Sequence, residues 1–291
     1  MENAEKNSDK IFDALINDVG KARSIAITYC GSLEGVTRHL ESILRISKPE
    51  INVLTMHGDY MHNIILPYLS EYMDYVILFS HSFSTTCLQR VYQSLKLLDT
   101  RLSIIISQPL QSLEKFLKKD DNTVVEIDER TYRLSVMLAN IKLGTRLCGG
   151  NNQRIKRMEQ EVMLSNIVND VIRKYGKFIE KPLEFDLIAS TYSLLSVAEE
   201  LGDIGYMYTV IDRLHNFVKF ANNIVLFYTT AEEHVAREAV LNIKRFSMQR
   251  NIVEVKINTD PLTAPLYGLI MAYYMHLKRS LYNSRGRESI G

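Results

Sequence analysis

Five hydroxyl side chains follow an apolar run near the middle of the first half of the chain. The run 76–79 reads Val-Ile-Leu-Phe, and the hydroxyls belong to Ser80, Ser82, Ser84, Thr85 and Thr86. Hydroxyls donate hydrogen bonds without adding charge, and a helix expected over residues 87–98 would bring its N–H groups and positive dipole end to the same place. Hydroxyls also cap ordinary helices, but this cluster exceeds what one cap requires. We therefore favour a phosphate-binding loop over simple capping.

A second polar turn follows an earlier apolar run, residues 24–29. It consists of Cys30, Gly31 and Ser32, and a helix is expected directly after it. In open α/β sheets, ligands bind at the carboxyl ends of strands, near the point where the strand order reverses. Both polar turns stand at expected strand ends, so we predict that they face one site.

The elements that position these turns are short β-branched runs alternating with longer helical patterns. Strands are expected at 24–29, 51–56, 76–79, 102–107 and 123–127. Helices are expected at 33–47, 62–72, 87–98, 110–117 and 132–147. This alternation is typical of βαβ units and a parallel sheet covered by helices on both faces.

The run Gly149-Gly150-Asn151-Asn152 indicates a helix end and a linker. After it, a polar helix is expected over 154–175, then strands at 185–189, 224–228 and 252–257 with helices at 194–201, 232–249 and 266–281. The second half thus repeats the plan of the first in shorter form. We predict an α/β protein of two tandem domains, 1–150 and 151–291, each with a mainly parallel sheet between helices.

Composition excludes several classes of protein. A net charge of +1 gives no electrostatic basis for binding nucleic acid, and the apolar runs are too short to span a membrane. The N-terminus lacks the apolar segment of a signal peptide. Three cysteines without a C-x-x-C pair predict a reducing, cytoplasmic setting with neither a disulfide framework nor a structural zinc site. No glycine-rich nucleotide loop follows any expected strand, which disfavours a nucleotide-binding protein.

Two further groups could do chemistry, and for both we favour the simpler interpretation. His57, Asp59 and His62 have some metal-like spacing but lack a further clear ligand, so we expect a solvated loop and no metal or other cofactor. Cys30 could be a nucleophile at a helix N-terminus, but no histidine partner stands near it in the sequence. A nucleophilic role for Cys30 is therefore the weaker interpretation.

In this order, these features resemble the SIS family of phosphosugar isomerase and phosphosugar-binding domains. The closest resemblance is to double-domain members such as the isomerase half of glucosamine-6-phosphate synthase. That family has C-G-T/S-S after its first strand, here Cys30-Gly31-Ser32-Leu33, and S-x-S-G-E-T after its third, here the segment 80–85. The resemblance implies a sugar-phosphate site formed by Cys30, Gly31, Ser32, Ser80, His81, Ser82, Ser84, Thr85 and, after Glu126-Ile127, Thr131. Phe83 and Ser84 replace the family's glycine and glutamate.

The second half carries the catalytic part of the resemblance. The synthases have a glutamate at a helix end and a His-Gly sixteen residues later, here Glu199 and His215-Asn216. The His-Asn form also resembles archaeal phosphoglucose/phosphomannose isomerases, and the segment 260–266 resembles the synthase D-P-L-x-A-P. The resemblance implies aldose–ketose isomerisation through an enediol, with Glu199 as base and His215 for ring opening. In the family that histidine often reaches the neighbouring subunit's site, so a homodimer is implied. The alternatives are that Glu199 and Glu200 form an exposed acidic pair on a helix, and that His215 is a surface histidine or one satisfied within the core.

Departures from the family leave two classes of function open. The C-terminal lysine motif of the synthases is not recognisable, Ser196 stands where they have a lysine, and no glutamine-hydrolysing domain is expected. The first class is an isomerase of a hexose 6-phosphate, of the fructose or glucosamine 6-phosphate type. The second is a non-catalytic sugar-phosphate-binding or regulatory protein. The sugar, and the need for a separate glutaminase partner, stay open.

Overall fold

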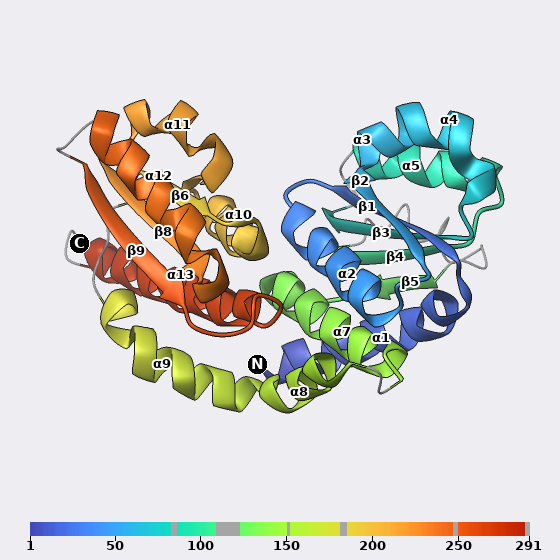
Figure 1. Ribbon diagram of the computed structural model, residues 1–291, viewed down its shortest axis with the longest axis horizontal. Coiled ribbons are helices and arrows are strands. Elements are labelled where there is room, and N and C mark those ends of the chain that lie inside the picture. Colours follow the sequence, from blue (N-terminus) through green and yellow to red (C-terminus); the bar gives the residue numbers. More distant parts are fainter. Residues whose placement is uncertain (83–85, 109–122, 150–151, 181–184, 247–249, 289–291) are drawn as a thin grey trace. The chain divides into compact units, whose positions relative to one another are not determined.

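The computed structural model describes residues 1–82, 86–108, 123–149, 152–180, 185–246 and 250–288 (Figure 1). The chain divides into two compact units, Met1–Glu161 and Val162–Gly291. Helix α8 (Gln153–Glu161) belongs to the first unit because it packs against α7 (Tyr132–Leu147). The sequence-based domains, 1–150 and 151–291, stay a prediction.

The first unit is built on a five-stranded parallel sheet, as the sequence predicts. Its strands are β1 (Ser24–Cys30), β2 (Asn52–His57), β3 (Tyr75–Ser82), β4 (Leu102–Gln108) and β5 (Thr123–Glu126). They lie in the order β2-β1-β3-β4-β5. The order reverses between β1 and β3, so the carboxyl edge of these two strands is the place where a ligand is expected in such a sheet.

Helices cover both faces of this sheet. On one side, alternate residues such as Ala26, Val76 and Ile104 pack with Met61 and Leu88 in one apolar cluster. The helical segments on that side are α3 (Gly58–Tyr60), η1 (Met61–Ile65), α4 (Leu66–Leu69), η2 (Ser70–Tyr72) and α5 (Thr86–Leu97). The helix expected over 62–72 is therefore a series of short turns.

The other face is covered by α1 (Glu2–Lys21), α2 (Glu34–Ser47) and α7, and α7 contacts both α1 and α2 (Figure 1). Helix α1 was not expected from the sequence, because its charged residues dominate the pattern. Its apolar residues are nonetheless on one buried face, with Ile11, Leu15 and Val19 fully enclosed. The helix expected over 110–117 lies outside the described residues.

The second unit repeats the plan with a four-stranded parallel sheet. Its strands are β6 (Leu187–Ser190), β7 (Met207–Val210), β8 (Asn223–Thr229) and β9 (Asn251–Ile257), in the order β7-β6-β8-β9. Strand β7 was not expected from the sequence, because its four residues do not form an apolar run. As in the first sheet, the order reverses beside the unit's first strand, here between β6 and β8.

The helical segments of the second unit also lie on both faces of its sheet. They are α9 (Leu164–Glu180), η4 (Tyr192–Leu194), α10 (Leu195–Asp203), η5 (Ile211–Arg213), α11 (Leu214–Phe217), η6 (Val218–Phe220), η7 (Thr230–Glu232), α12 (Glu233–Phe246) and α13 (Ala264–Glu288). The helix expected over 154–175 is two helices, α8 and α9. Within the described ranges, no helix combines the length and apolar content needed to cross a bilayer.

One aspartate in each unit ties two neighbouring strands together at their amino ends. Asp74 accepts hydrogen bonds from the backbone N–H groups of Arg23 and Ser24, at 2.9 and 3.0 Å. Asp186 accepts them from Asn222 and Asn223, at 2.8 and 2.9 Å. These backbone donors lower the pKa of Asp186 below its ordinary value.

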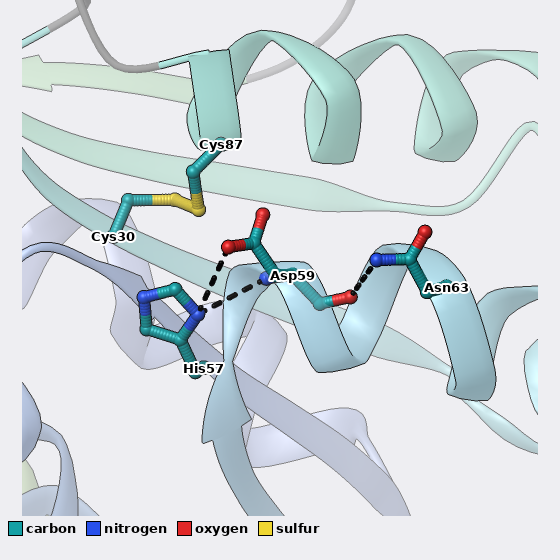
Figure 2. The surroundings of a disulfide bond; sticks show 5 residues. All are labelled: Cys30, His57, Asp59, Asn63 and Cys87. Atoms are coloured by element: carbon teal, nitrogen blue, oxygen red, sulfur yellow. Dashed lines mark hydrogen bonds and ion pairs between the residues drawn. A yellow bond between two sulfur atoms is a disulfide. The ribbon is translucent and has the colours of Figure 1, made fainter.

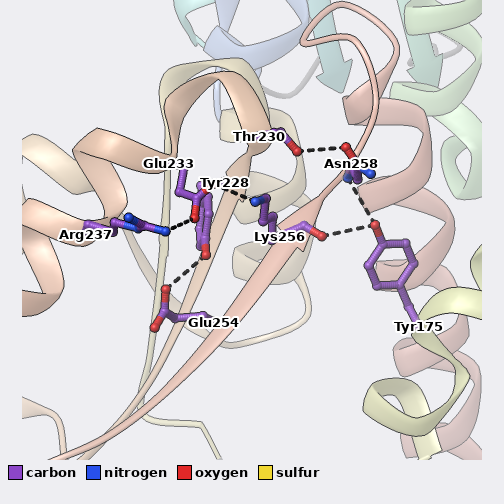
Figure 3. Close-up of polar contacts among 8 residues, drawn as sticks. All are labelled: Tyr175, Tyr228, Thr230, Glu233, Arg237, Glu254, Lys256 and Asn258. Carbon is purple, nitrogen blue, oxygen red and sulfur yellow. Dashed lines mark hydrogen bonds and ion pairs between the residues drawn. The ribbon is translucent and has the colours of Figure 1, made fainter.

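Polar contacts join β8, β9 and α12 in the second unit (Figure 3). Glu233 forms ion pairs of 2.6 Å with both Arg237 and Lys256. The hydroxyl of Tyr228 donates to Glu254 Oε2 at 3.0 Å, and burial together with this carboxylate raises the pKa of Tyr228 to about 12. This network fixes the start of α12 against the sheet.

Candidate functional site

The two polar turns of the first unit lie side by side at the carboxyl edge of its sheet. Cys30, the last residue of β1, pairs in register with Ser80 of β3. Gly31 follows with a φ of +88°, in the left-handed region that favours glycine, and so turns the chain from β1 toward α2. The geometry therefore brings Ser32 and Ser80 to the same strand pair, at the reversal of strand order.

His81 and Tyr132 form one wall of this edge. Their ring centroids are 4.6 Å apart, and the Tyr132 hydroxyl donates to the carbonyl of Ile105 at 2.8 Å. Ser107 Oγ donates to the carbonyl of His81. Complete burial raises the pKa of Tyr132 above its ordinary value, so this phenol stays neutral. The backbone after Ser80 is thus held firmly by its neighbours.

Arg133 brings a positive charge to this edge, and sequence reasoning missed it. The residue is 1% exposed, and its Nη2 donates to Ser32 O at 2.7 Å and to Ser32 Oγ at 3.2 Å. It stands in the first turn of α7, two residues after Thr131, whose position was predicted for the site. Only the packing of α7 against the sheet shows that this arginine is buried.

Part of the predicted phosphate loop cannot be placed. Ser82 ends β3, where its backbone pairs in register with Gln108. The side chain of Ser82, and Phe83, Ser84 and Thr85 entirely, lie outside the described residues. Thr131 is described at the start of α7, where its carbonyl accepts a hydrogen bond from Ser135 Oγ at 2.7 Å.

Cys30 and Cys87 are joined by a disulfide bond, with their Cα atoms 6.0 Å apart (Figure 2). The expectation that this chain has no disulfide is therefore wrong. Cys30 ends β1, and Cys87 stands in the first turn of α5. Helix α5 packs on one face of the first sheet, and both cysteines contact the apolar cluster on that face. An odd number of cysteines shows only that one of them is left without a disulfide partner. That cysteine is Cys148, which is buried.

At the equivalent edge of the second unit, the hydroxyls bind a carboxylate from the chain itself. Glu232 Oε2 accepts hydrogen bonds from Thr191 Oγ1, Ser193 Oγ and Thr229 Oγ1, at 2.7, 2.5 and 2.7 Å. These residues follow or end β6 and β8, where the strand order reverses. In the first unit, by contrast, Ser32 at the corresponding edge contacts a guanidinium. The edge of the first unit therefore suits a negatively charged ligand, and the edge of the second unit does not.

Glu199 and His215 are both described in the second unit, in different surroundings. Glu199 is 2% exposed on α10, one turn from the buried Ser196, whose hydroxyl has no hydrogen-bond partner among the described residues. His215, exposed on α11, lines a cavity of about 600 Å³ between α11 and α12 with Asp212, Lys219, Glu238 and Arg250. Glu199 does not line that cavity, so the structure does not bring these two residues together within it.

Comparison with known proteins shows the fold. No family model matches the sequence, and no curated protein matches it. Among solved structures, glucosamine-6-phosphate deaminase from Thermotoga maritima aligns with a TM-score of 0.61 at 13% identity, over 95% of this chain and 92% of that one. Tagatose-6-phosphate ketose/aldose isomerase from Escherichia coli aligns with a TM-score of 0.61 at 10% identity, over 96% and 92%. The chain has a phosphosugar isomerase fold.

A third solved structure also shares this fold. The C-terminal domain of glucosamine-fructose-6-phosphate aminotransferase from Francisella tularensis aligns with a TM-score of 0.59 at 11% identity, over 94% of this chain and 92% of that one. The phosphosugar isomerase fold therefore spans both units of the chain. At these identities the likeness concerns the fold alone.

Proposed function

We propose that this chain binds a hexose 6-phosphate, of the fructose or glucosamine 6-phosphate type, and isomerises it between aldose and ketose. In this proposal the two units are tandem SIS domains, and the phosphate sits at the carboxyl edge of β1 and β3. The observation that carries the proposal is the meeting of Ser32, Ser80 and the buried Arg133 at this edge.

The chemistry of this edge suits a phosphate dianion. Arginine donates hydrogen bonds with its charge, and such bonds to phosphate are roughly twice as strong as neutral ones. The hydroxyls of the predicted loop, Ser82, Ser84 and Thr85, would add neutral donors around it, with His81 and Thr131 at its sides. The turn Cys30–Gly31 would let the backbone approach the sugar. The equivalent edge of the second unit does not suit a phosphate, because its hydroxyls already donate hydrogen bonds to the Glu232 carboxylate.

The enzyme proposal rests on Glu199. Enediol chemistry needs a carboxylate base that is held close to the substrate and shielded from water. Glu199 is buried on α10, one turn after Ser196, whose hydroxyl has no partner in the part of the chain that the structure describes. A buried polar group without a partner calls for an explanation, and contact with a bound substrate would supply one. In this proposal Glu199 moves the proton between C1 and C2, and His215 assists ring opening.

The alternative is a non-catalytic sugar-phosphate-binding or regulatory protein. The departures at Phe83, Ser84 and Ser196 favour it, since each replaces a residue that the catalytic family members have. Both proposals share the phosphate site, so binding and catalysis must be tested separately.

A thermal-shift series tests the binding site. Fructose 6-phosphate should raise the melting temperature of the wild-type chain, whereas fructose at the same concentration should not. Ser32→Ala should reduce this shift, because it removes a hydroxyl at the proposed phosphate position. Ser193→Ala, which removes a hydroxyl at the equivalent edge of the second unit, is the matched control and should leave it unchanged. Equal thermal shifts in the two variants would contradict a phosphate site at the edge of β1 and β3.

Isomerisation assays separate the two proposals. Wild-type chain incubated with fructose 6-phosphate in deuterated water should form the aldose with deuterium at C2, and Glu199→Gln should lose this activity while it still binds the sugar phosphate. An active Glu199→Gln variant would show that another group is the base. Binding without any isomerisation by the wild-type chain would favour the regulatory alternative.

A further inference from the structure

Beside the proposed sugar-phosphate site, four potential metal ligands gather at the carboxyl edge of the first sheet (Figure 2). We call this group the cysteine–histidine cluster; it consists of Cys30, His57, Asp59 and Cys87. The ligand atoms of His57, Asp59 and Cys87 all lie within 4.8 Å of one another, and Cys30 is bonded to Cys87. They come from the end of β1, the end of β2, α3 and the first turn of α5.

Gly58 makes this gathering possible. A Cβ atom at this position would lie 2.5 Å from Cys87 Sγ and 2.8 Å from Cys30 Sγ, which is closer than packed atoms can approach. Any other residue would therefore push the segment from His57 to Asp59 away from the sulfur atoms. Because Gly58 lets the backbone lie close to both sulfur atoms, its neighbours His57 and Asp59 can place a nitrogen and an oxygen ligand near them.

The donor set suits zinc. Two cysteine thiolates, one imidazole and one carboxylate are ligands that Zn²⁺ takes in tetrahedral sites. With Zn–S bonds of about 2.3 Å, tetrahedral geometry puts two sulfur atoms about 3.8 Å apart. The Cα separation of 6.0 Å between Cys30 and Cys87 allows that spacing through side-chain rotation alone. The cluster is also accessible, because the side chains of His57 and Asp59 are 42% and 53% exposed.

We propose that the cysteine–histidine cluster binds one Zn²⁺ ion when its disulfide is reduced. A dithiol reductant exchanges with the disulfide, gives two cysteine thiols and leaves as its own disulfide. Zn²⁺ then displaces the two thiol protons and is held by both thiolates, His57 and Asp59. The disulfide and the metal therefore exclude each other, because each uses the same two sulfur atoms. The ion would fasten β1, β2 and α5 together.

Cobalt titration of the full chain tests this proposal, since Co²⁺ substitutes for Zn²⁺ and its thiolate complexes absorb visibly. Chain reduced with a phosphine, then titrated without oxygen, should take up a single equivalent of Co²⁺ with thiolate charge-transfer absorption. Addition of Zn²⁺ should remove that absorption. The oxidised chain should show none. These readouts use no sugar phosphate, so they stay independent of the proposed function.

Variants identify the ligands. His57→Ala and Asp59→Ala change exposed side chains and should weaken Co²⁺ binding by at least the roughly 10–100-fold that loss of an outer-shell partner costs. Cys87→Ser should remove most of the thiolate absorption. His62→Ala is the control for His57, because the His62 ring instead contacts Ser94 Oγ at 2.8 Å, and Cys148→Ser is the control for the cysteines. Circular dichroism confirms that each variant is folded.

Two results would overturn the proposal. One is a reduced, folded wild-type chain that takes up no Co²⁺, which would leave the pair as a disulfide only. The other is loss of binding in Cys148→Ser or His62→Ala with full binding in Asp59→Ala and His57→Ala, which would place the metal elsewhere.

Discussion

At the scale of single residues, Arg133 changes the interpretation of the first unit most. A buried charge costs free energy unless it is paired or used. Its contact with Ser32 places that charge where the sequence predicts a phosphate. The hydroxyl turns could be found from the sequence because serines and a glycine after an apolar run have a recognisable pattern. A lone arginine in a helical pattern looks like a solvent-exposed one, so Arg133 could not be found.

Asp186 gives a prediction about stability and pH. Backbone N–H groups lower its pKa in the folded chain, so its carboxylate stabilises the fold above the unfolded pKa of about 3.9. That contribution is lost as the pH falls toward the folded pKa. Asp186→Asn should therefore lower the free energy of unfolding at neutral pH, and the difference from wild type should shrink as the solution is acidified. Urea unfolding at several pH values measures this difference.

The exposed Asp212, on the same unit, provides the control for that series. Asp212→Asn should show a smaller effect, since no strand is tied by its carboxylate. A gap between Asp186→Asn and wild type that stays constant down to about pH 3, below the ordinary aspartate pKa, would contradict the assignment.

At the scale of elements, the parallel strands of the first sheet were predictable and the short segments were not. Apolar runs such as 76–79 are typical of strands buried on both faces. Strand β7 has only four residues, with Met207 39% exposed, so it gives no such run. The turns from Met61 to Tyr72 alternate between helix types and have no single period. The meeting of Cys30 and Cys87 depends on how β1 and α5 pack, which spacing in the sequence does not show.

The start of α12 should depend strongly on Glu232. This residue accepts hydrogen bonds from three hydroxyls and completes a capping box with Thr229. Glu232→Ala would leave those hydroxyls without their acceptor, and hydrogen bonds to a charged group contribute about 1.5–3 kcal/mol. We expect a loss of about 2–3 kcal/mol in the free energy of unfolding, measured by urea titration.

Glu238, exposed on the same helix, provides a matched control for Glu232. Glu238→Ala should change the free energy of unfolding by less than about 0.5 kcal/mol. Similar losses in the two variants would show that the hydroxyl cluster does not stabilise the helix start.

At the scale of the whole molecule, the repeated plan explains why one edge is proposed for the ligand. Both sheets reverse their strand order beside hydroxyl groups. The edge of the second sheet holds the internal carboxylate of Glu232, and the edge of the first sheet holds the buried Arg133. Only the edge of the first sheet therefore suits an added anion. The sequence predicts the repeat but not this division, because the partners of Glu232 and Arg133 are set by tertiary packing.

The proposed homodimer gives a complementation prediction. If Glu199 and His215 of one site come from different subunits, neither Glu199→Gln nor His215→Ala alone should isomerise the sugar phosphate. Equal mixing of the two variants, with subunit exchange, makes half of the dimers mixed, and each mixed dimer has one intact site. Activity should then recover to roughly a quarter of wild type. No recovery in a mixture shown to exchange subunits would contradict a shared site.

The central claim is that a sugar phosphate binds through its phosphate at the edge formed by β1, β3 and the start of α7. Calorimetric titration of the intact chain with fructose 6-phosphate, beside an Arg133→Met variant, tests it most directly. The account predicts binding at one site per chain, none for fructose, and a loss of about 1.5–3 kcal/mol in binding free energy when the charged donor is removed. Thermal unfolding checks that Arg133→Met is folded. Unchanged affinity in a folded Arg133→Met chain, or equal binding of fructose and fructose 6-phosphate, would contradict it.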